Sequence, residues 1–387
     1  MTPGARVQAA IELLDRIADG EPAEKALTSW ARRSRFAGSG DRAAVRDHVF
    51  QALRCWRSYA CIGGAQTGRG RMIGALRAAG ADPATVFTGV GHAPETLTDA
   101  EIAAGTPPTG AAACDLPDWL MEEFRASLGD KGEAAGMALR QRAPVMLRAD
   151  LRRNSRQDAV YALAEYGVKG TAHPIAKTAI CVTEGARKLV RSRAYLEGLV
   201  ELQDGSGQAA MERIDLSGVT SVLDYCAGGG GKSLALAART DARIFAHDID
   251  PARMQDLPDR AARCGVEITQ IATSSLTRNA PFDIVLCDAP CSGSGTWRRT
   301  PEAKWRLTPE RLTDLTQIQS QILQDAAALV APGGRLVYAT CSLLVAENEA
   351  RIDNFLDTVP GWTRCDMHRF DVSDGGDGFF VAQLRRA

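Results

Sequence analysis

Apolar residues recur at intervals of three and four along the first part of the chain, which is the spacing of one face of a helix. One such stripe consists of Val7, Ile11, Leu14 and Ile17. A second consists of Val45, Val49, Leu53 and Trp56. We predict a helix that ends at Gly20 and another over residues 42–59 with Asp41 as its N-cap. The pattern therefore indicates an all-α region that reaches to about Ala93.

The middle of the chain mixes short β-like segments with helical ones. Residues 101–113 are rich in Gly, Pro and Ala and are expected to form a linker. Asp115–Asp118 supplies a cap and an early proline for a helix through Leu128. The expected strands are residues 144–150 and 178–184, and the expected helices are residues 155–166 and 186–197. These elements indicate a small α+β module that ends in a polar, glycine-rich turn at residues 202–208.

Strand signals alternate with helix signals in the last part of the chain. The expected strands are residues 221–225, 243–246, 267–272, 283–287 and 334–339. A helix is expected over residues 312–329, and Glu347 with Asn348 is expected to start another. Such alternation is typical of a doubly wound, mainly parallel sheet. We therefore predict an α/β protein in three parts, residues 1–137, 138–208 and 209–387.

The composition is that of an ordinary globular protein. With 387 residues, 45% of them hydrophobic and 24% charged, the chain is long enough for two or three domains. No run approaches the roughly eighteen apolar residues of a membrane span, and the N-terminus does not resemble a signal peptide. We expect a cytoplasmic protein without membrane contact. Nothing in the sequence demands an oligomer, so we expect a monomer.

Cysteine spacing and charge distribution narrow the chemistry. The ten cysteines contain no CxxC pair, which argues against a zinc site or a disulfide framework, and we predict no metal site. The net charge of −1 conceals two basic segments. Residues 140–193 hold twelve Lys and Arg against four Asp and Glu, and residues 32–57 hold seven against two. These segments are compatible with binding to a polyanionic partner.

Two expected strands deliver a cysteine to one edge of the sheet. The strand at 283–287 is followed by Asp288 and Cys291, and the strand at 334–339 is followed by Cys341. Because the carboxyl ends of parallel strands border a crevice, candidate chemistry lies there. Either cysteine alone would more often be a buried, small hydrophobic residue.

A glycine-rich turn follows the first strand of this sheet. It consists of Cys226, Ala227, Gly228, Gly229, Gly230, Gly231 and Lys232. Glycines let backbone amides approach a ligand closely, but nucleotide, flavin, NAD and S-adenosylmethionine sites all use such a turn. Asp248 ends the next strand and could accept two ribose hydroxyls, whereas Asp250 fits a helix cap better.

Four sequence blocks, in order, resemble the RsmB/NOP family of RNA cytosine-5 methyltransferases. The blocks are CAGGGGK at 226–232, DAPCSGSG at 288–295, RRTPEAKW at 298–305 and YATCSLLVAENE at 338–349. The resemblance extends from Gln203 to Phe380 and favours the bacterial type that modifies small-subunit rRNA. It implies a Rossmann-like class I methyltransferase domain that uses S-adenosyl-L-methionine. A NusB-like RNA-binding helical domain and an RRM-like module would precede that domain.

The resemblance also implies roles for single residues. Carbon-5 of cytosine is too poor a nucleophile to accept a methyl group directly, so a thiolate, that of Cys341, would first add to carbon-6. Cys291 would remove the carbon-5 proton and release the adduct. Asp288 would bond the cytosine edge near N3 and can touch the cofactor, while Lys232 would lower a cysteine pKa or hold Asp288. The expected phosphate contacts are Arg298, Arg299 and Lys304.

Two positions depart from the family pattern. Gly229 stands where the family has proline, which should loosen the turn without removing its amides. The third strand ends in Ala272–Ser275 instead of an acidic residue that bonds the adenine amino group. The hydroxyl of Ser274 lacks charge assistance, so we expect weaker cofactor binding rather than none.

Three alternatives to methylation of small-subunit rRNA stay open. The same reaction on tRNA is the nearest, because the NusB-like front favours rRNA only by analogy. An RNA-binding ribosome-assembly factor without catalysis is conceivable, although Cys341, Cys291, Asp288 and Lys232 are all present. In DNA cytosine methylation Cys291 would attack, and the block around Cys341 would be unexplained.

Overall fold

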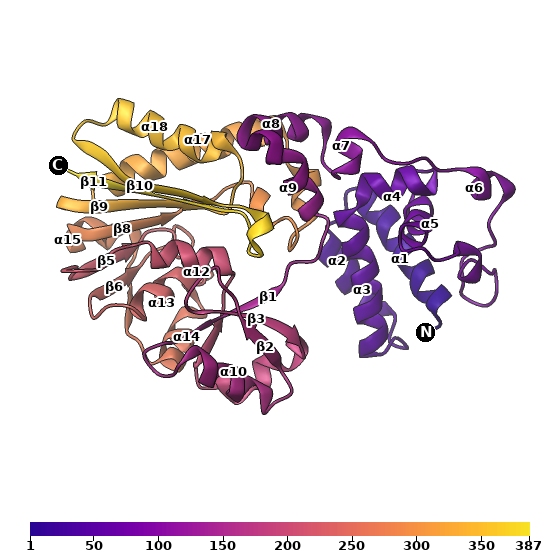
Figure 1. The fold of residues 1–387 in the computed structure, drawn as a ribbon, viewed down its shortest axis with the longest axis horizontal. Helices are drawn as coiled ribbons and strands as arrows, with labels where there is room; N and C mark the ends of the chain where they lie inside the picture. Colours follow the sequence, from indigo (N-terminus) through magenta and orange to yellow (C-terminus); the bar gives the residue numbers. More distant parts are fainter. The chain divides into compact units, whose positions relative to one another are not determined.

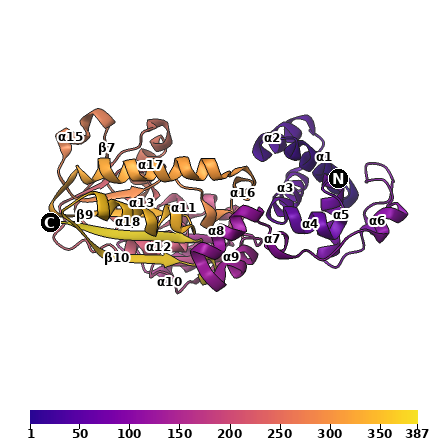
Figure 2. The same cartoon turned by 90° about the horizontal axis from the view of Figure 1, so that it is seen from above.

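A computed structural model describes all residues, 1–387, and divides them into two compact units. Unit 1 comprises Met1–Arg142 together with the segment Trp297–Arg306. Unit 2 comprises Ala143–Thr296 and Leu307–Ala387. Unit 1 is helical, and unit 2 contains two sheets with helices against them (Figures 1 and 2). No helix combines the length and the apolar composition that crossing a membrane requires.

Unit 1 confirms the predicted all-α region. Its longer helices are α1 (Pro3–Ala18), α2 (Ala23–Arg33), α3 (Ser39–Arg54), α4 (Trp56–Gly63), α5 (Gly68–Ala78) and α8 (Asp118–Leu128). Its shorter helices are α6 (Asp99–Ala103), α7 (Gly110–Ala113), α9 (Gly132–Ala138) and α16 (Ala303–Arg306). The expected linker at residues 101–113 therefore contains the end of α6 and all of α7.

The expected single helix over residues 42–59 is wrong. The structure ends α3 at Arg54 and begins α4 at Trp56. The buried carboxylate of Asp115 accepts hydrogen bonds from the backbone amides of Arg57 at 2.9 Å and Ser58 at 2.8 Å, so a distant residue caps α4. Asp41 is also not the N-cap of α3. It lies in the first turn of α3, and its carboxylate accepts a hydrogen bond from the amide of Gly38, the N-cap residue.

Unit 2 begins with the α+β module, an antiparallel sheet in the order β2-β3-β1-β4. Its elements are β1 (Val145–Ala149), α10 (Arg156–Ala164), β2 (Lys169–Ala172), β3 (Ala179–Glu184), α11 (Arg193–Leu196) and β4 (Val200–Leu202). The expected helix at 186–197 is divided, because the side chain of Ser192 caps α11 after a 3₁₀ segment. The expected polar turn at 202–208 instead opens helix α12 (Gly205–Glu212), which Asp204 caps.

The large sheet has the order β10-β11-β9-β8-β5-β6-β7. Its strands are β5 (Ser221–Asp224), β6 (Arg243–Ala246), β7 (Ile268–Gln270), β8 (Phe282–Asp288), β9 (Val330–Thr340), β10 (Trp362–Phe370) and β11 (Phe379–Arg386). The strands β5 to β9 are parallel, which confirms the predicted α/β fold. The antiparallel pair β10 and β11 was not predicted.

Helices cover both faces of the large sheet (Figure 1). They are α12, already described, and α13 (Gly231–Ala237), α14 (Leu257–Cys264), α15 (Leu276–Asn279), α17 (Pro309–Ala327) and α18 (Glu349–Thr358). Successive side chains of a strand point to opposite faces. Thus Ile284 packs in the cluster that holds α12 and α13, whereas Val285 packs in the cluster that holds α17 and α18. Burial on both faces leaves the strand ends as the accessible edge.

Candidate active site

Cys291 and Cys341 lie side by side at the carboxyl edge of the large sheet. The strands β8 and β9 are parallel neighbours in which Asp288 pairs with Ala339, so the two loops leave the sheet at the same height. The two Sγ atoms are 3.4 Å apart, and both residues are half-buried. The amide of Gly295 donates to the carbonyl oxygen of Cys341 at 2.9 Å, which ties one loop to the other. One substrate atom can therefore lie within reach of both sulfurs.

The Glu347 carboxylate connects the two cysteine loops through hydrogen bonds. This residue is fully buried, and its carboxylate accepts hydrogen bonds from the Ser292 amide at 2.7 Å, the Ser292 hydroxyl at 2.5 Å and the Ser342 hydroxyl at 2.5 Å. The amide of Gln319 also donates to it at 3.1 Å. Ser292 follows Cys291 and Ser342 follows Cys341, so a single carboxylate fixes both loops. Glu347 was predicted only to start a helix; its position six residues after Cys341 was the only signal of this role in the sequence.

Lys232 and Asp288 form a close ion pair beside the cysteines. Lys232 Nζ lies 2.5 Å from Asp288 Oδ2 and 5.1 Å from the ring centre of Phe379. Burial lowers the pKa of Lys232, but the neighbouring Asp288 carboxylate outweighs it, so the pKa is raised. A permanent ammonium charge therefore faces the cysteine pair.

The two thiols differ in acidity. The hydrogen bond from Cys291 is the largest effect on Cys341 and lowers its pKa; burial opposes this, and the charge of Lys232 supports it. The same hydrogen bond, followed by burial, raises the pKa of Cys291 well above the ordinary range. The pair is therefore polarised, because Cys341 loses its proton at a lower pH than Cys291.

Replacing Cys291 by alanine should raise the pKa of Cys341, because it removes the main hydrogen bond to the thiolate. More alkaline solution is then needed for the same thiolate fraction. The rate of Cys341 alkylation by iodoacetamide, followed by peptide mass spectrometry, should reach its midpoint at a higher pH than in the wild type. Cys365→Ala removes an exposed thiol elsewhere and serves as the control. An unchanged or lower midpoint in Cys291→Ala would contradict the polarised pair.

The glycine-rich turn presents amides to the same edge. Gly228 and Gly230 have φ angles of +50° and +77°, which side chains rarely adopt, and a Cβ on Gly230 would lie 2.2 Å from a methyl carbon of Leu257. The amide of Gly228 is taken by Asp248 Oδ2 at 2.9 Å. The amides of Gly229 and Gly231 make no hydrogen bond within the protein. The turn, which begins with Cys226 and Ala227, thus offers unused donors to a ligand.

Two arginines hold the carbonyl side of the turn. Arg260 of α14 donates to the carbonyl oxygen of Gly229, and Arg148 of β1 donates to that of Gly231 at 3.1 Å. Glu201 of β4 is 3% exposed and forms an ion pair with Arg260 at 3.3 Å. The α+β module therefore braces the turn directly at Gly231 through Arg148, and indirectly at Gly229 through the ion pair between Glu201 and Arg260.

The acidic residues near the turn differ in their surroundings. Asp248 is buried and also pairs with Arg253 at 3.1 Å, while Asp250 caps a short 3₁₀ segment by accepting from the Ala252 amide at 3.1 Å. Asp224 is fully buried; one oxygen accepts from Ser233 and the other has no partner. Burial raises the pKa of Asp224 to about 7. Asp224 was not among the predicted site residues. Ser274, which was, lies exposed beyond β7.

The structure corrects the expected RNA contacts of Lys304 and Arg298. Lys304 is fully buried in unit 1 and donates to the carbonyl oxygen of Arg54 at 2.9 Å. Arg298 is 6% exposed, and its carbonyl oxygen accepts from Arg54 Nε at 2.8 Å. A phosphate cannot reach these buried side chains in this arrangement. Arg299 is exposed and remains a proposed phosphate contact.

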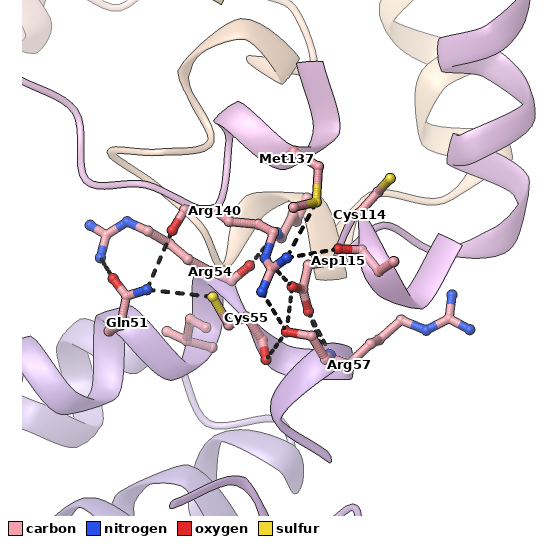
Figure 3. A network of polar contacts seen from close by, with 12 residues as sticks. Gln51, Arg54, Cys55, Arg57, Cys114, Asp115, Met137 and Arg140 are labelled. Atoms are coloured by element: carbon pink, nitrogen blue, oxygen red, sulfur yellow. Dashed lines mark hydrogen bonds and ion pairs between the residues drawn. The ribbon is translucent and has the colours of Figure 1, made fainter. Parts of the chain in front are cut away.

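A polar network around Arg54, Asp115 and Arg140 surrounds these buried groups (Figure 3). Arg140 pairs with Asp115 at 2.9 Å and donates to the Ser58 hydroxyl at 3.3 Å. Trp297, also fully buried, stacks on Phe124 with ring centres 5.9 Å apart. The segment Trp297–Arg306 therefore contributes Trp297, Arg298 and Lys304 to the interior of unit 1, while Arg299 stays exposed.

Comparison with known proteins identifies the family. A family model described as 16S rRNA methyltransferase RsmB/F matches residues 214–385, and an RsmF/B-like ferredoxin-like domain matches residues 116–187. Ribosomal RNA small subunit methyltransferase B of Xanthomonas campestris pv. campestris is 31% identical over 301 residues, which cover 72% of this chain and 68% of that protein. The chain belongs to the RsmB/F family.

A second relative and a solved structure support the assignment of this chain to the RsmB/F family. The protein of the same name from Klebsiella pneumoniae is 32% identical over 285 residues, which cover 69% of this chain and 65% of that protein. The chain thus spans just under two thirds of that relative. The crystal structure of a methyltransferase homolog protein from Pyrococcus horikoshii is 26% identical, with a TM-score of 0.63 over 72% of this chain and 97% of that chain.

Proposed function

We propose that this RsmB/F family protein methylates carbon-5 of cytosine in small-subunit rRNA, with S-adenosyl-L-methionine as the methyl donor. The observation that carries the proposal is the pair of Sγ atoms, 3.4 Å apart, at the sheet edge that also holds the glycine-rich turn. A cytoplasmic, monomeric enzyme fits this activity. The names of the relatives favour rRNA over tRNA as the substrate.

The turn fits the proposed cofactor. Gly229 and Gly231 offer amides without internal acceptors, and Asp224 keeps one buried oxygen without a donor. Asp248 and Ser274 follow the next two strands, where the ribose and adenine would be held. When bound there, S-adenosyl-L-methionine supplies an electrophilic methyl group.

Cys341 begins the proposed reaction. Its thiolate forms a bond to carbon-6 of cytosine, and the electron pair of the 5,6 double bond moves toward N3. Asp288 at the ring edge passes a proton from the Lys232 ammonium to N3, and this proton returns when the adduct breaks down. Carbon-5 thereby becomes nucleophilic enough to be methylated. Lys232 holds the Asp288 carboxylate in place at 2.5 Å.

Cys291 completes the proposed reaction as the base. Once Cys341 is a neutral thioether, its hydrogen bond and negative charge no longer raise the pKa of Cys291. Burial still raises that pKa, but release of the Cys291 proton to solvent becomes easier than in the free enzyme. Its thiolate then takes the proton from carbon-5. The C–H electrons restore the 5,6 double bond, the bond between carbon-6 and sulfur breaks, and Cys341 returns as a thiolate.

The purified chain should convert cytosine to 5-methylcytosine in small-subunit rRNA transcribed in vitro. Nucleoside mass spectrometry after incubation with S-adenosyl-L-methionine identifies the product, and bisulfite sequencing locates it. Total tRNA in a parallel reaction separates the two RNA substrates. Methylation of tRNA alone would replace the rRNA assignment, and a methyl group on another atom would refute the proposed chemistry. Absence of any product, with RNA binding intact, would favour a non-catalytic assembly factor.

A further inference from the structure

Unit 1 exposes an aromatic side chain among arginines between α2 and α3. Phe36 is 76% exposed, although burial of an aromatic ring is usually favourable. Arg32 and Arg33 end α2, and Arg35 precedes Phe36; all three are exposed. We call Arg32, Arg33, Arg35 and Phe36 the Phe36 patch. Its ring and charges lie on the surface, where a partner can contact both.

The arginines of the Phe36 patch form no ion pair with a carboxylate. Three arginines of the neighbouring helices do, Arg6 with Asp41 at 2.8 Å, Arg16 with Glu21 at 2.8 Å and Arg46 with Glu24 at 2.5 Å, whereas the exposed Arg42 at the start of α3 does not. Within the patch, Arg33 makes a single hydrogen bond, to the Ser29 hydroxyl at 3.5 Å, and none of the three forms an ion pair. The negative end of the α2 dipole explains why Arg32 and Arg33 are favourable at the end of that helix, but Arg35 lies beyond the helix and has no such explanation. The unpaired charge favours an anionic partner.

A groove of about 920 Å³ adjoins the Phe36 patch. Trp30, Phe36 and Val90 supply apolar lining, and Arg33 lies at the same groove. Glu12 also lines it, so a carboxylate acceptor is available beside the aromatic surface. Such a combination suits a flat heterocycle with exocyclic amino groups better than a purely apolar or purely anionic ligand.

We infer that the Phe36 patch and its groove bind an unpaired segment of RNA, with a base stacked on Phe36 and phosphates on Arg32, Arg33 and Arg35. This inference rests on the proposed function for the class of partner. The bases of a duplex are stacked inside the helix, whereas an unpaired base presents a face to an exposed ring. Phosphates spaced along one RNA strand account for the arginines at the end of α2 and in the turn that follows it.

The binding test uses the full chain and a fluorescent oligoadenylate of about twelve nucleotides, whose bases carry an exocyclic amino group and which contains no cytosine and therefore no methylation target. Phe36→Ala should weaken binding about tenfold without changing the dependence on salt, because it removes stacking and no charge. Arg32→Gln combined with Arg35→Gln should reduce the slope of log affinity against log salt by about 1.4, since each phosphate contact on a single strand contributes about 0.7. Phe36→Trp should retain the affinity.

Arg46→Gln is the matched control, because it removes one positive charge from an exposed ion pair. It should leave the salt slope almost unchanged. Unchanged affinity of Phe36→Ala, or equal competition by an RNA duplex, would overturn the inference; an acidic protein segment would then be the remaining occupant.

Crosslinking locates the contact independently. An oligomer that contains 4-thiouridine should crosslink to the peptide that holds Phe36, and crosslinks confined to unit 2 would overturn the inference. The outcome is separable from the proposed function. A wild-type chain without methyltransferase activity but with Phe36-dependent binding would refute the activity alone, whereas intact methylation with Phe36-independent binding would refute the patch alone.

Discussion

Cys341→Ala is expected to abolish methyl transfer and to form no covalent complex with RNA, whereas Cys291→Ala is expected to accumulate one. In the first variant no sulfur can add to carbon-6. In the second, Cys341 still adds and carbon-5 still becomes methylated, but no base removes the carbon-5 proton, so the bond between sulfur and carbon-6 persists. Denaturing gel electrophoresis with labelled rRNA and S-adenosyl-L-methionine reveals the complex as a band that migrates more slowly than the free chain.

The same experiment contains its own controls. The double variant Cys291→Ala with Cys341→Ala should form no complex, which would identify Cys341 as the linked residue. Turnover of Cys291→Ala should fall by about 10²- to 10⁴-fold, the usual contribution of a positioned base. A complex in Cys341→Ala but not in Cys291→Ala would exchange the roles of the two residues. No complex in either variant would contradict a covalent route.

The parallel part of the fold could be predicted because its strands are buried on both faces. Residues 221–225, 243–246 and 283–287 form short apolar runs ended by polar or glycine residues, and β5, β6 and β8 lie there. Parallel strands end at one edge, so the meeting of Cys291 and Cys341 followed from topology as soon as both strands were recognised.

Long-range contacts explain what the sequence did not reveal. The helix expected at 42–59 divides because Asp115, far along the chain, caps α4. The strand β10 (Trp362–Phe370) is largely half-exposed and polar, so it lacks the apolar signature of the parallel strands. Local sequence contains neither the partner of a cap nor the partner of an edge strand.

Lys304 was wrongly predicted to contact RNA because the prediction used its charge without knowledge of its burial. Lys304 stands in a basic block next to the cysteine loop, which suggested solvent exposure, yet its ammonium is buried against the carbonyl oxygen of Arg54. Burial lowers its pKa to about 8. The exposed arginines without an ion pair that we assign to RNA lie instead around Phe36, in the basic segment of residues 32–57.

Glu347→Gln should reduce turnover by about 100-fold, although Glu347 touches neither substrate nor cofactor. Glutamine keeps the size of the side chain but replaces one carboxylate oxygen by an NH₂ group. That group is a donor, so it cannot accept the hydrogen bonds that Ser292 and Ser342 donate to the carboxylate. The loops that present Cys291 and Cys341 then lose their shared anchor, and a displacement of about 1 Å can cost about 10²-fold in rate. Loss of hydrogen bonds to a buried charge should also lower the free energy of unfolding by about 2–3 kcal/mol.

Steady-state kinetics and chemical denaturation measure these two effects of Glu347→Gln separately. Placed in the Cys291→Ala background, the change should also slow accumulation of the covalent complex, which a loss of stability alone would not do below the unfolding transition. Glu101→Gln is the matched control, since its carboxylate pairs with Arg69 of unit 1 at 2.6 Å and contacts neither cysteine loop. If Glu347→Gln forms the complex as fast as its parent, the buried carboxylate stabilises the fold without positioning the sulfurs.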